Sequence, residues 1–173
     1  MICENNYRYN IRFYNKSCYG KMINGQAVEY VSEMRYGLCN MSFNGCEVIA
    51  VHNALVYLKK TVPIYEISRY MEKFRMLIGI LGCNPHKIGK ALEKYEVSYK
   101  KSRNIGNADT FILSFWTGKR FLSSIHTVFC VRQKNGTVVY NRYNSCREAR
   151  VYRDNSAIAE QKKIIAVYSI KGV

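Results

Sequence analysis

The spacing of apolar residues changes near residue 96. From Asn44 to about residue 95, apolar residues recur every three or four positions, as they do along one face of a helix. Beyond residue 96 they gather in short runs rich in Val, Ile, Phe and Tyr, which favour β-strands. Helices followed by strands predict an α+β fold, in which a helical part packs on a mostly antiparallel sheet.

The clearest helical segment begins in the sequence NGCEVIAVHN, at residues 44 to 53. Its main apolar stripe consists of Val48, Val51, Leu55 and Leu58. Further apolar residues fill much of its remaining surface, so we expect a central helix that is buried on several sides. Asn44, followed three residues later by Glu47, is a variant of the capping box and would place Cys46 at the second helical position.

Two further helices are expected before residue 96. One begins after Thr61, with Pro63 near its first turn. The residues that it should turn toward the core are Ile64, Ile67, Met71, Phe74 and Ile78. The other begins at Asn84 and Pro85, where a polar cap precedes a proline. Its expected core residues are Ile88, Leu92 and Tyr95.

Five runs are predicted as the strands of the sheet: VSYK, FILSFW, HTVFCVRQ, TVVYNRY and IIAVYSI. A turn near residues 134–136 should join the third and fourth runs in a hairpin that His126 opens. The N-terminal run YRYNIRFY alternates apolar side chains with a period of two and is also predicted as a strand. The sequence contains neither a linker rich in Pro or Ser nor an internal repeat, so we expect one domain over 1–173. It should consist of a Tyr-rich N-terminal extension (1–38), a helical part (39–96) and a sheet part (97–173).

The composition is basic. Lys and Arg number 27 against 12 Asp and Glu, a formal charge of +15 that attracts anionic partners such as nucleic acid, anionic lipid or acidic peptides. The charges are spread along the sequence, so a merely solvated basic surface explains them as well. The 15 tyrosines would suit stacking on single-stranded nucleic acid, but half-buried strand positions explain them too, and signatures of RNA-binding modules, Walker A and GxGxxG patterns are absent.

Cysteine usage points to a reducing compartment. Seven cysteines at irregular spacing do not resemble a disulfide framework, and the N-terminus lacks the apolar core of a secretory signal. No run reaches 18 apolar residues, so we expect no membrane span and a cytoplasmic location. Cys83 and His86 have the spacing of half a zinc site, but no second pair follows, so neither a metal nor a cofactor is predicted.

Cys46 is the candidate nucleophile. Near a helix N-terminus, unpaired backbone amides favour the thiolate, whereas the adjacent Glu47 opposes it, and the local sequence leaves the balance open. Of the three histidines, His52 lies about 9 Å further along the same predicted helix and rotated away from the thiol. His86 is expected to be an exposed residue of a helix start. His126 therefore remains as the candidate base.

Asn141, on the outgoing strand of the same hairpin, could orient the imidazole of His126. A two-residue turn at Asn135 and Gly136 would separate the two residues by about 13 Å along the strand. A longer loop centred on residues 133 and 134 would place them directly opposite. Both registers put the two side chains on one face of the sheet, and the mechanism requires the longer loop.

Three features together resemble the papain-like cysteine peptidases. They are Asn44-Gly45-Cys46 leading into an apolar helix, Gly-Cys-Asn-Pro at 82–85, and a strand that begins at His126 and is followed by Asn141. The C39-like group, which includes the leader-peptide-cleaving domains of bacteriocin exporters, is the nearest in pattern. The resemblance covers roughly residues 38–145. It implies a papain-like α+β fold with Cys46 as nucleophile, His126 as general base and acid, and Asn141 as the orienting residue.

The same resemblance implies that Asn40 takes the place of the glutamine that helps to form the oxyanion hole. Asn is one methylene shorter, and the Cys-Gly-Pro of the family is Cys46-Glu47-Val48 in this chain. The expected activity is peptide hydrolysis, or acyl transfer to another amine, on a peptide or protein substrate, and the charge of +15 favours an acidic one. The alternative is a papain-like fold without activity, or a basic module that binds acidic peptides or nucleic acid.

Overall fold

The computed structural model describes residues 2–14, 19–118 and 124–171. Six strands form one sheet in the order β3-β8-β4-β5-β6-β7, and every neighbouring pair is antiparallel. They are β3 (Tyr99–Ser102), β4 (Thr110–Trp116), β5 (Ile125–Gln133), β6 (Gly136–Tyr140), β7 (Arg150–Tyr152) and β8 (Ile164–Ile170). The five strands predicted after residue 96 all lie in this sheet, whereas β7 was not predicted from the sequence.

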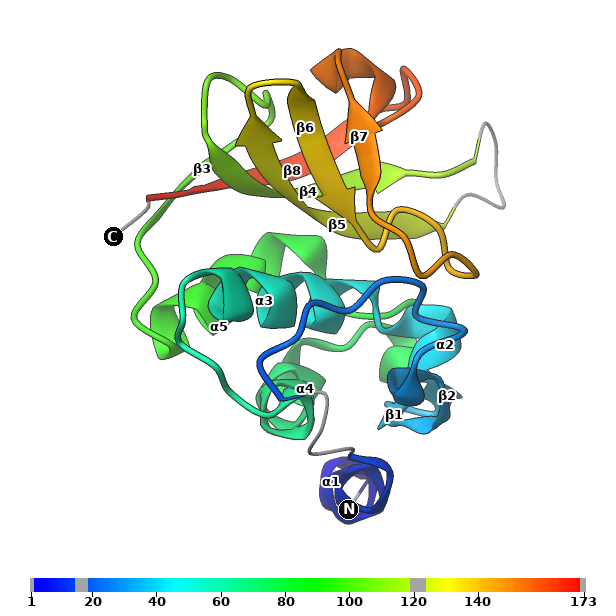
Figure 1. Ribbon diagram of the computed structural model, residues 1–173. Coiled ribbons are helices and arrows are strands. Elements are labelled where there is room, and N and C mark those ends of the chain that lie inside the picture. Colours follow the sequence, from blue (N-terminus) through cyan, green and yellow to red (C-terminus); the bar gives the residue numbers. More distant parts are fainter. Residues whose placement is uncertain (1, 15–18, 119–123, 172–173) are drawn as a thin grey trace.

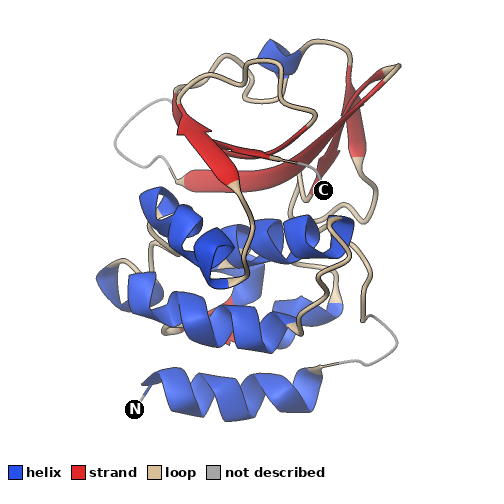
Figure 2. Ribbon diagram, turned by 90° about the vertical axis from the view of Figure 1, so that its left-hand side faces the viewer, coloured by secondary structure: helices blue, strands red, loops and turns tan. Residues whose placement is uncertain are grey.

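Helices cover one face of the sheet in successive layers (Figure 1, Figure 2). The helix α3 (Cys46–Tyr57) packs on β5, with α5 (Ile88–Lys94) beside it and α4 (Ile64–Met71) beneath. The first ten residues of α3 are all buried, which confirms the predicted central helix. The architecture is α+β, and no helix in the described residues is both long and apolar enough to cross a bilayer.

Short elements connect these layers. A hairpin of β1 (Arg35–Tyr36) and β2 (Cys39–Asn40) leads into α2 (Met41–Asn44), directly before α3. The described part of the chain also contains five 3₁₀ turns: η2 (Tyr30–Glu33), η3 (Glu72–Phe74), η4 (Leu77–Gly79), η5 (Pro85–Lys87) and η6 (Asn155–Ala157).

The N-terminal run forms a helix, α1 (Ile2–Phe13), so its prediction as a strand is wrong. The residues that α1 buries are two asparagines one helical turn apart, Asn6 and Asn10. The Asn6 amide donates to Gly37 O and to the Glu72 carboxylate, and the Asn10 amide donates to Arg35 O. The Tyr7 ring of α1 also meets the Tyr65 ring of α4 edge to face at 5.8 Å. Because the two buried side chains of α1 are amides, hydrophobic periodicity did not reveal this helix.

The second predicted helix is shorter than expected. Its regular part is α4, after which η3 and η4 turn the chain, and Ile78 is 53% exposed instead of facing the core. Pro63 occupies the cap position of α4. The third helix agrees better with the sequence, since the Asn84 side chain accepts a hydrogen bond from the His86 amide at 2.9 Å before η5 and α5.

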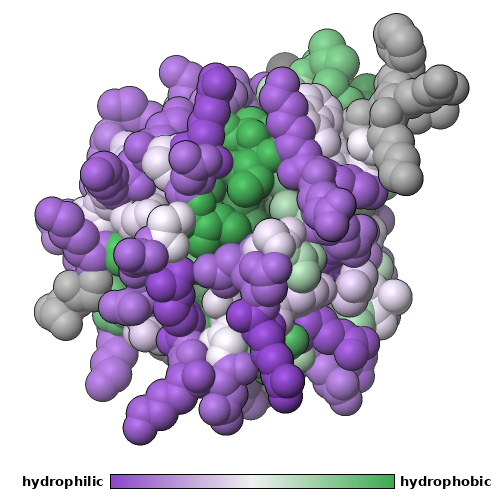
Figure 3. Space-filling view, turned by 90° about the horizontal axis from the view of Figure 1, so that it is seen from above, coloured by the Kyte–Doolittle hydropathy of each residue, from purple (hydrophilic) through white to green (hydrophobic). Residues whose placement is uncertain are grey.

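The sheet carries a separate apolar cluster on each face. Toward the helices, the core includes Ile112 and Phe129 together with the buried residues of α3, α4 and α5. On the outer face, Phe111, Leu113 and Val128 pack with Ile158 of the segment that follows η6. Figure 3 views this outer face and shows an apolar hollow between polar side chains. Alternate residues of β4 and β5 therefore belong to different cores.

Candidate functional site

Cys46 is the first residue of α3, and Gly45 takes the cap position without a side-chain hydrogen bond. The Asn44 amide, predicted to cap this helix, instead donates to the backbone oxygens of Tyr36 at 2.8 Å and Gly79 at 2.5 Å. The predicted capping box is therefore wrong, although the helix begins within two residues of the expected position. Asn44 serves to hold three chain segments together beside the helix start.

The Cys46 thiol is enclosed. The residue is 5% exposed, and its Sγ lies 3.3 Å from Glu47 Oε2 and 3.9 Å from Ile125 O. Burial and, next, the Glu47 carboxylate raise the pKa of this thiol well above its ordinary value. These two effects outweigh the position at the start of the helix, so Cys46 is a thiol at neutral pH.

Glu47 is itself a buried carboxyl group, with 2% of its surface exposed. Besides the Cys46 thiol it accepts a hydrogen bond from Thr127 Oγ1 at 3.4 Å, and that hydroxyl lies 2.9 Å from Ser114 Oγ. Burial raises the pKa of Glu47 to about 7. The carboxyl group beside Cys46 is thus itself held by a hydroxyl group of the sheet.

His126 lies on the other face of the sheet from Cys46. In the β4/β5 register His126 is opposite Phe115, a member of the outer cluster, and the two rings meet edge to face at 5.9 Å. Its neighbour Thr127 points to the helix side and reaches Glu47. Neighbouring strand residues point to opposite faces, so the sheet separates the imidazole from the thiol. No hydrogen bond joins Cys46 and His126, both of which are described residues.

The His126 imidazole is 6% exposed and Nε2 lies 2.7 Å from Asn141 O. Because a carbonyl oxygen only accepts, Nε2 carries the proton in this contact. Burial, more than any other cause, lowers the pKa of His126 to about 4, so the ring is neutral at pH 7. The structure therefore brings His126 and Asn141 together through the backbone of Asn141 and not through its side chain.

The hairpin register explains this contact. Gln133 pairs with Gly136, so Lys134 and Asn135 form the turn, and neither of the two registers considered from the sequence occurs. β6 ends at Tyr140, and Asn141 adopts a left-handed backbone with φ 58°. This change of direction leaves its carbonyl beside His126.

The Asn141 side chain binds a residue that the sequence did not single out. Its Nδ2 donates to Gln26 Oε1 at 3.0 Å, and its Oδ1 accepts from the backbone N–H of Gln26 at 3.1 Å. Gln26 Nε2 in turn donates to the backbone oxygen of Ser42, and the backbone N–H of Asn141 donates to Asn24 Oδ1. Both Asn141 and Gln26 are 1% exposed. A glutamine in an irregular segment carries no periodic signal that would reveal this buried network.

The remaining candidates lie apart from this network. Asn40 is exposed, and its side chain makes no capping hydrogen bond at the start of α2. His52 is buried in α3 with Nε2 3.1 Å from Lys21 O, whereas His86 is exposed. Six cysteines are free thiols, and Cys18 lies outside the described residues. Among the described residues no three His, Cys, Asp or Glu side chains are grouped to hold a metal ion.

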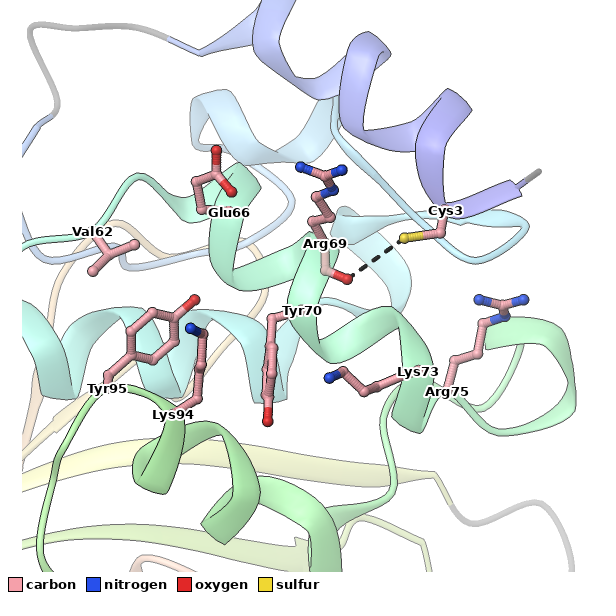
Figure 4. Close-up of a pocket in the computed structure, with 9 residues that line it drawn as sticks. All are labelled: Cys3, Val62, Glu66, Arg69, Tyr70, Lys73, Arg75, Lys94 and Tyr95. Carbon is pink, nitrogen blue, oxygen red and sulfur yellow. Dashed lines mark hydrogen bonds between the residues drawn. The ribbon is translucent and has the colours of Figure 1, made fainter.

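A basic groove lies on the helical side of the molecule, away from Cys46 (Figure 4). Its volume is about 680 Å³, and α1, α4, η3 and α5 contribute to its walls. The residues that line it are Cys3, Val62, Glu66, Arg69, Tyr70, Lys73, Arg75, Lys94 and Tyr95. Four of the nine are cations and one is an acid, which makes it a candidate site for an anionic ligand.

The cations of the groove differ in their partners. Arg69 pairs with Glu4 at 3.2 Å and Arg75 with the buried Glu72 at 2.9 Å. Lys73 Nζ lies 3.7 Å from the centre of the Tyr70 ring. Within the described part of the chain, neither Lys73 nor Lys94 is paired with a carboxylate. These two ammonium groups are therefore available to an anion.

Comparisons of this chain with protein-family models, with curated proteins and with solved structures found no match.

Proposed function

We propose that this protein is a basic binding module that holds an anionic ligand, an acidic peptide or a single-stranded nucleic acid, in the groove between α1, α4 and α5. The observation that carries the proposal is the groove itself, whose lining contains four cations and one carboxylate. Lys73 and Lys94 supply unpaired charge, and Tyr70 and Tyr95 supply aromatic surface beside it. Repeated anionic groups with planar side chains or bases match this lining.

The geometry around Cys46 also favours binding over catalysis. A nucleophilic thiol needs a base within hydrogen-bond reach. Here the groups around the thiol are a carboxyl and a backbone oxygen, and His126 lies across the sheet. We therefore propose a papain-like fold in which a cysteine-led helix packs on an antiparallel sheet and the catalytic pairing is lost.

A cysteine peptidase or acyl transferase remains a second proposal, supported by one contact. Cys46 Sγ lies 3.9 Å from Ile125 O, next to His126 in the chain. Activity would require the start of β5 to turn over, so that His126 replaced Thr127 on the helix side. It would also require the oxyanion to be bound without Asn40 in its exposed position.

Binding to two fluorescent probes tests the first proposal: an acidic peptide and an oligothymidine of about ten nucleotides. Fluorescence anisotropy at low salt should show binding to at least one probe, with affinity that falls steeply as salt rises. The Lys73→Ala, Lys94→Ala variant should lose about tenfold in affinity or more, because it removes both unpaired ammonium groups.

The matched control is Lys100→Ala, Lys163→Ala, which removes the same charge from exposed positions outside the groove. Its affinity should stay within about twofold of wild type. Equal losses in the two variants would show that the charge acts diffusely and would exclude the groove as the site. Absence of binding to either probe at low salt would exclude the binding function.

A further inference from the structure

Six large apolar side chains are exposed on one side of the molecule. Their exposed fractions are Leu38 60%, Phe43 68%, Leu77 66%, Ile78 53%, Ile80 48% and Leu81 54%. They come from the β1/β2 hairpin, from α2 and from the loop 76–82, and together we call them the apolar loop surface. Scattered exposed apolar residues are ordinary, whereas a group of this size usually marks a surface that contacts another body.

Hydrogen bonds hold the three segments of this surface together. The Leu38 amide donates to Ile78 O at 3.1 Å, and Asn44 Nδ2 donates to Gly79 O at 2.5 Å. The backbones of Gly37 and Gly79 approach so closely that a Cβ on Gly37 would lie 2.3 Å from Ile78 O. The apolar loop surface is therefore one continuous, fixed feature.

Hydrogen bonds within the loop fix most of its backbone. The amides of residues 76 and 79–82 all donate to carbonyl oxygens within residues 76–82. Leu77 and Ile78 have left-handed φ values of 44° and 58°, which is costly for side chains of this kind and turns them outward.

The chain segments that form and flank the loop are basic. Residues 35–46 and 73–92 contain no Asp or Glu, and their cations are Arg35, Lys73, Arg75, Lys87 and Lys90. Arg75 and Lys90 pair with the flanking Glu72 and Glu93, whereas Arg35, Lys73 and Lys87 form no ion pair within the described residues. With a formal charge of +15 on the whole chain, a second copy would bring like charges together. An anionic surface complements this arrangement, and the exposed side chains would enter it.

We propose that the apolar loop surface docks onto an anionic lipid bilayer. Leu77, Ile78 and their apolar neighbours enter the boundary between headgroups and acyl chains, while the surrounding Lys and Arg side chains contact anionic headgroups. One apolar insertion combined with several cations is the arrangement that gives stable but reversible attachment to a membrane surface. This role goes beyond the proposed binding in the groove, because the side chains that enter the bilayer do not line the groove, although Lys73 and Arg75 lie in both regions.

Co-sedimentation with vesicles tests this proposal. One set contains phosphatidylcholine alone, and the other contains about 30% phosphatidylserine. The wild-type protein should sediment with the second set and much less with the first. The Leu77→Asn, Ile78→Asn variant should bind at least tenfold more weakly, because several methylene groups no longer enter the bilayer. Asn accepts a left-handed backbone, so this variant keeps the loop conformation and the net charge.

The matched control is Val151→Asn, which removes an apolar side chain that is 61% exposed on β7, outside the apolar loop surface. It should bind vesicles as wild type does. The Leu77→Asn, Ile78→Asn variant should also bind the acidic peptide or oligothymidine with wild-type affinity, which separates this proposal from the groove. Absence of binding to both vesicle sets, or equal binding by this variant, would overturn the proposal. So would a wild-type dimer that this variant converts to a monomer, since a second copy would then cover the surface.

Discussion

Cys46 and His126 lie on opposite faces of the sheet, although the thiol is 3.9 Å from the backbone oxygen of the residue before the histidine. The chain thus brings the two segments together while pointing their side chains apart. A shift of β5 by one residue would reverse the face to which each side chain points, and His126 would then replace Thr127 on the helix side. The orientation of β5 is therefore one of the conditions on which the two proposals differ.

Thiol reactivity should follow burial. We expect iodoacetamide to modify the partly exposed Cys3, Cys39 and Cys146 much faster than Cys46, whose pKa is raised by burial and by Glu47. Peptide-level mass spectrometry at a series of times measures each rate. The His126→Ala variant should leave the rate at Cys46 unchanged within about twofold, because the imidazole does not reach the thiol.

The opposite pattern would favour the second proposal. Cys46 would then be modified faster than the other thiols, with a pH profile centred below about 8.5, and His126→Ala would slow it. Such a result would mean that β5 turns over in solution. The labelling rate of Cys146 in the same digest is the internal control.

Glu47 should make the protein less stable as pH rises toward neutrality. Its pKa in the folded protein, about 7, is above its ordinary value of 4.5, so the folded state binds the extra proton between these values. The stabilising effect of that proton is complete below about pH 4.5 and is lost as pH rises through about 7. The total change is about 3 kcal/mol.

Urea unfolding of wild type and Glu47→Gln across pH 4.5 to 8 measures this effect as a difference. Burial lowers the pKa of His52 and of His126 to about 4, which acts in the opposite direction below pH 6.5, and both histidines are present in both proteins. Wild type should lose stability relative to the variant as pH rises. A difference that stayed constant with pH would contradict the buried, protonated carboxyl group.

Asn141 and Gln26 should be energetically coupled. A double-mutant cycle with Asn141→Ala, Gln26→Ala and the double variant should give a coupling of about 1 to 3 kcal/mol, because the side chains share a buried hydrogen bond. Asn141→Ala carries a further cost of about 1 kcal/mol from its left-handed backbone. Asn141→Gly removes that part and serves as the control. Purely additive losses would contradict the coupling.

Relief of backbone strain at Ile78 should stabilise the protein. Ile78→Asn places a residue that tolerates the left-handed region at φ 58°, and the side chain that it removes is 53% exposed. We expect a gain of about 1 kcal/mol in the free energy of unfolding. Lys59→Asn, at φ 57° but without branching at Cβ, should gain less. A loss of stability in Ile78→Asn would show that the isoleucine packs better than its exposure indicates.

Much of the fold follows from apolar spacing. The strand run FILSFW lies within β4, IIAVYSI forms β8, and the buried stripe of α3 includes Val48, Val51 and Leu55 as expected. α1 escaped prediction because the two side chains that it buries, Asn6 and Asn10, are polar. Hydrophobic patterns locate elements that are held by apolar contacts and miss those that are held by amides.

The candidate site was harder to predict than the fold. A period of two shows that His126, Val128 and Cys130 share a face, but not which face meets the helices. Over residues 126–131 each row of β5 has one polar and two apolar residues, and the alternate row is Thr127, Phe129 and Val131. The sequence could therefore place His126 on a strand beside Cys46 and could not show that the sheet separates the two side chains.

The buried network around Asn141 also bears on the order in which the chain can fold. Asn24 and Gln26 bond to a residue more than 110 positions later, and the Ala27 amide donates to Asn144 O. The segment around Gln26 therefore cannot settle until β6 has been synthesised and paired. Contacts of such long range slow folding. In a ribosome-bound chain that ends before residue 141, the Gln26 side chain would lack Asn141, and Ser42 at the start of α2 would lack the fixed Gln26 Nε2 that binds its backbone oxygen.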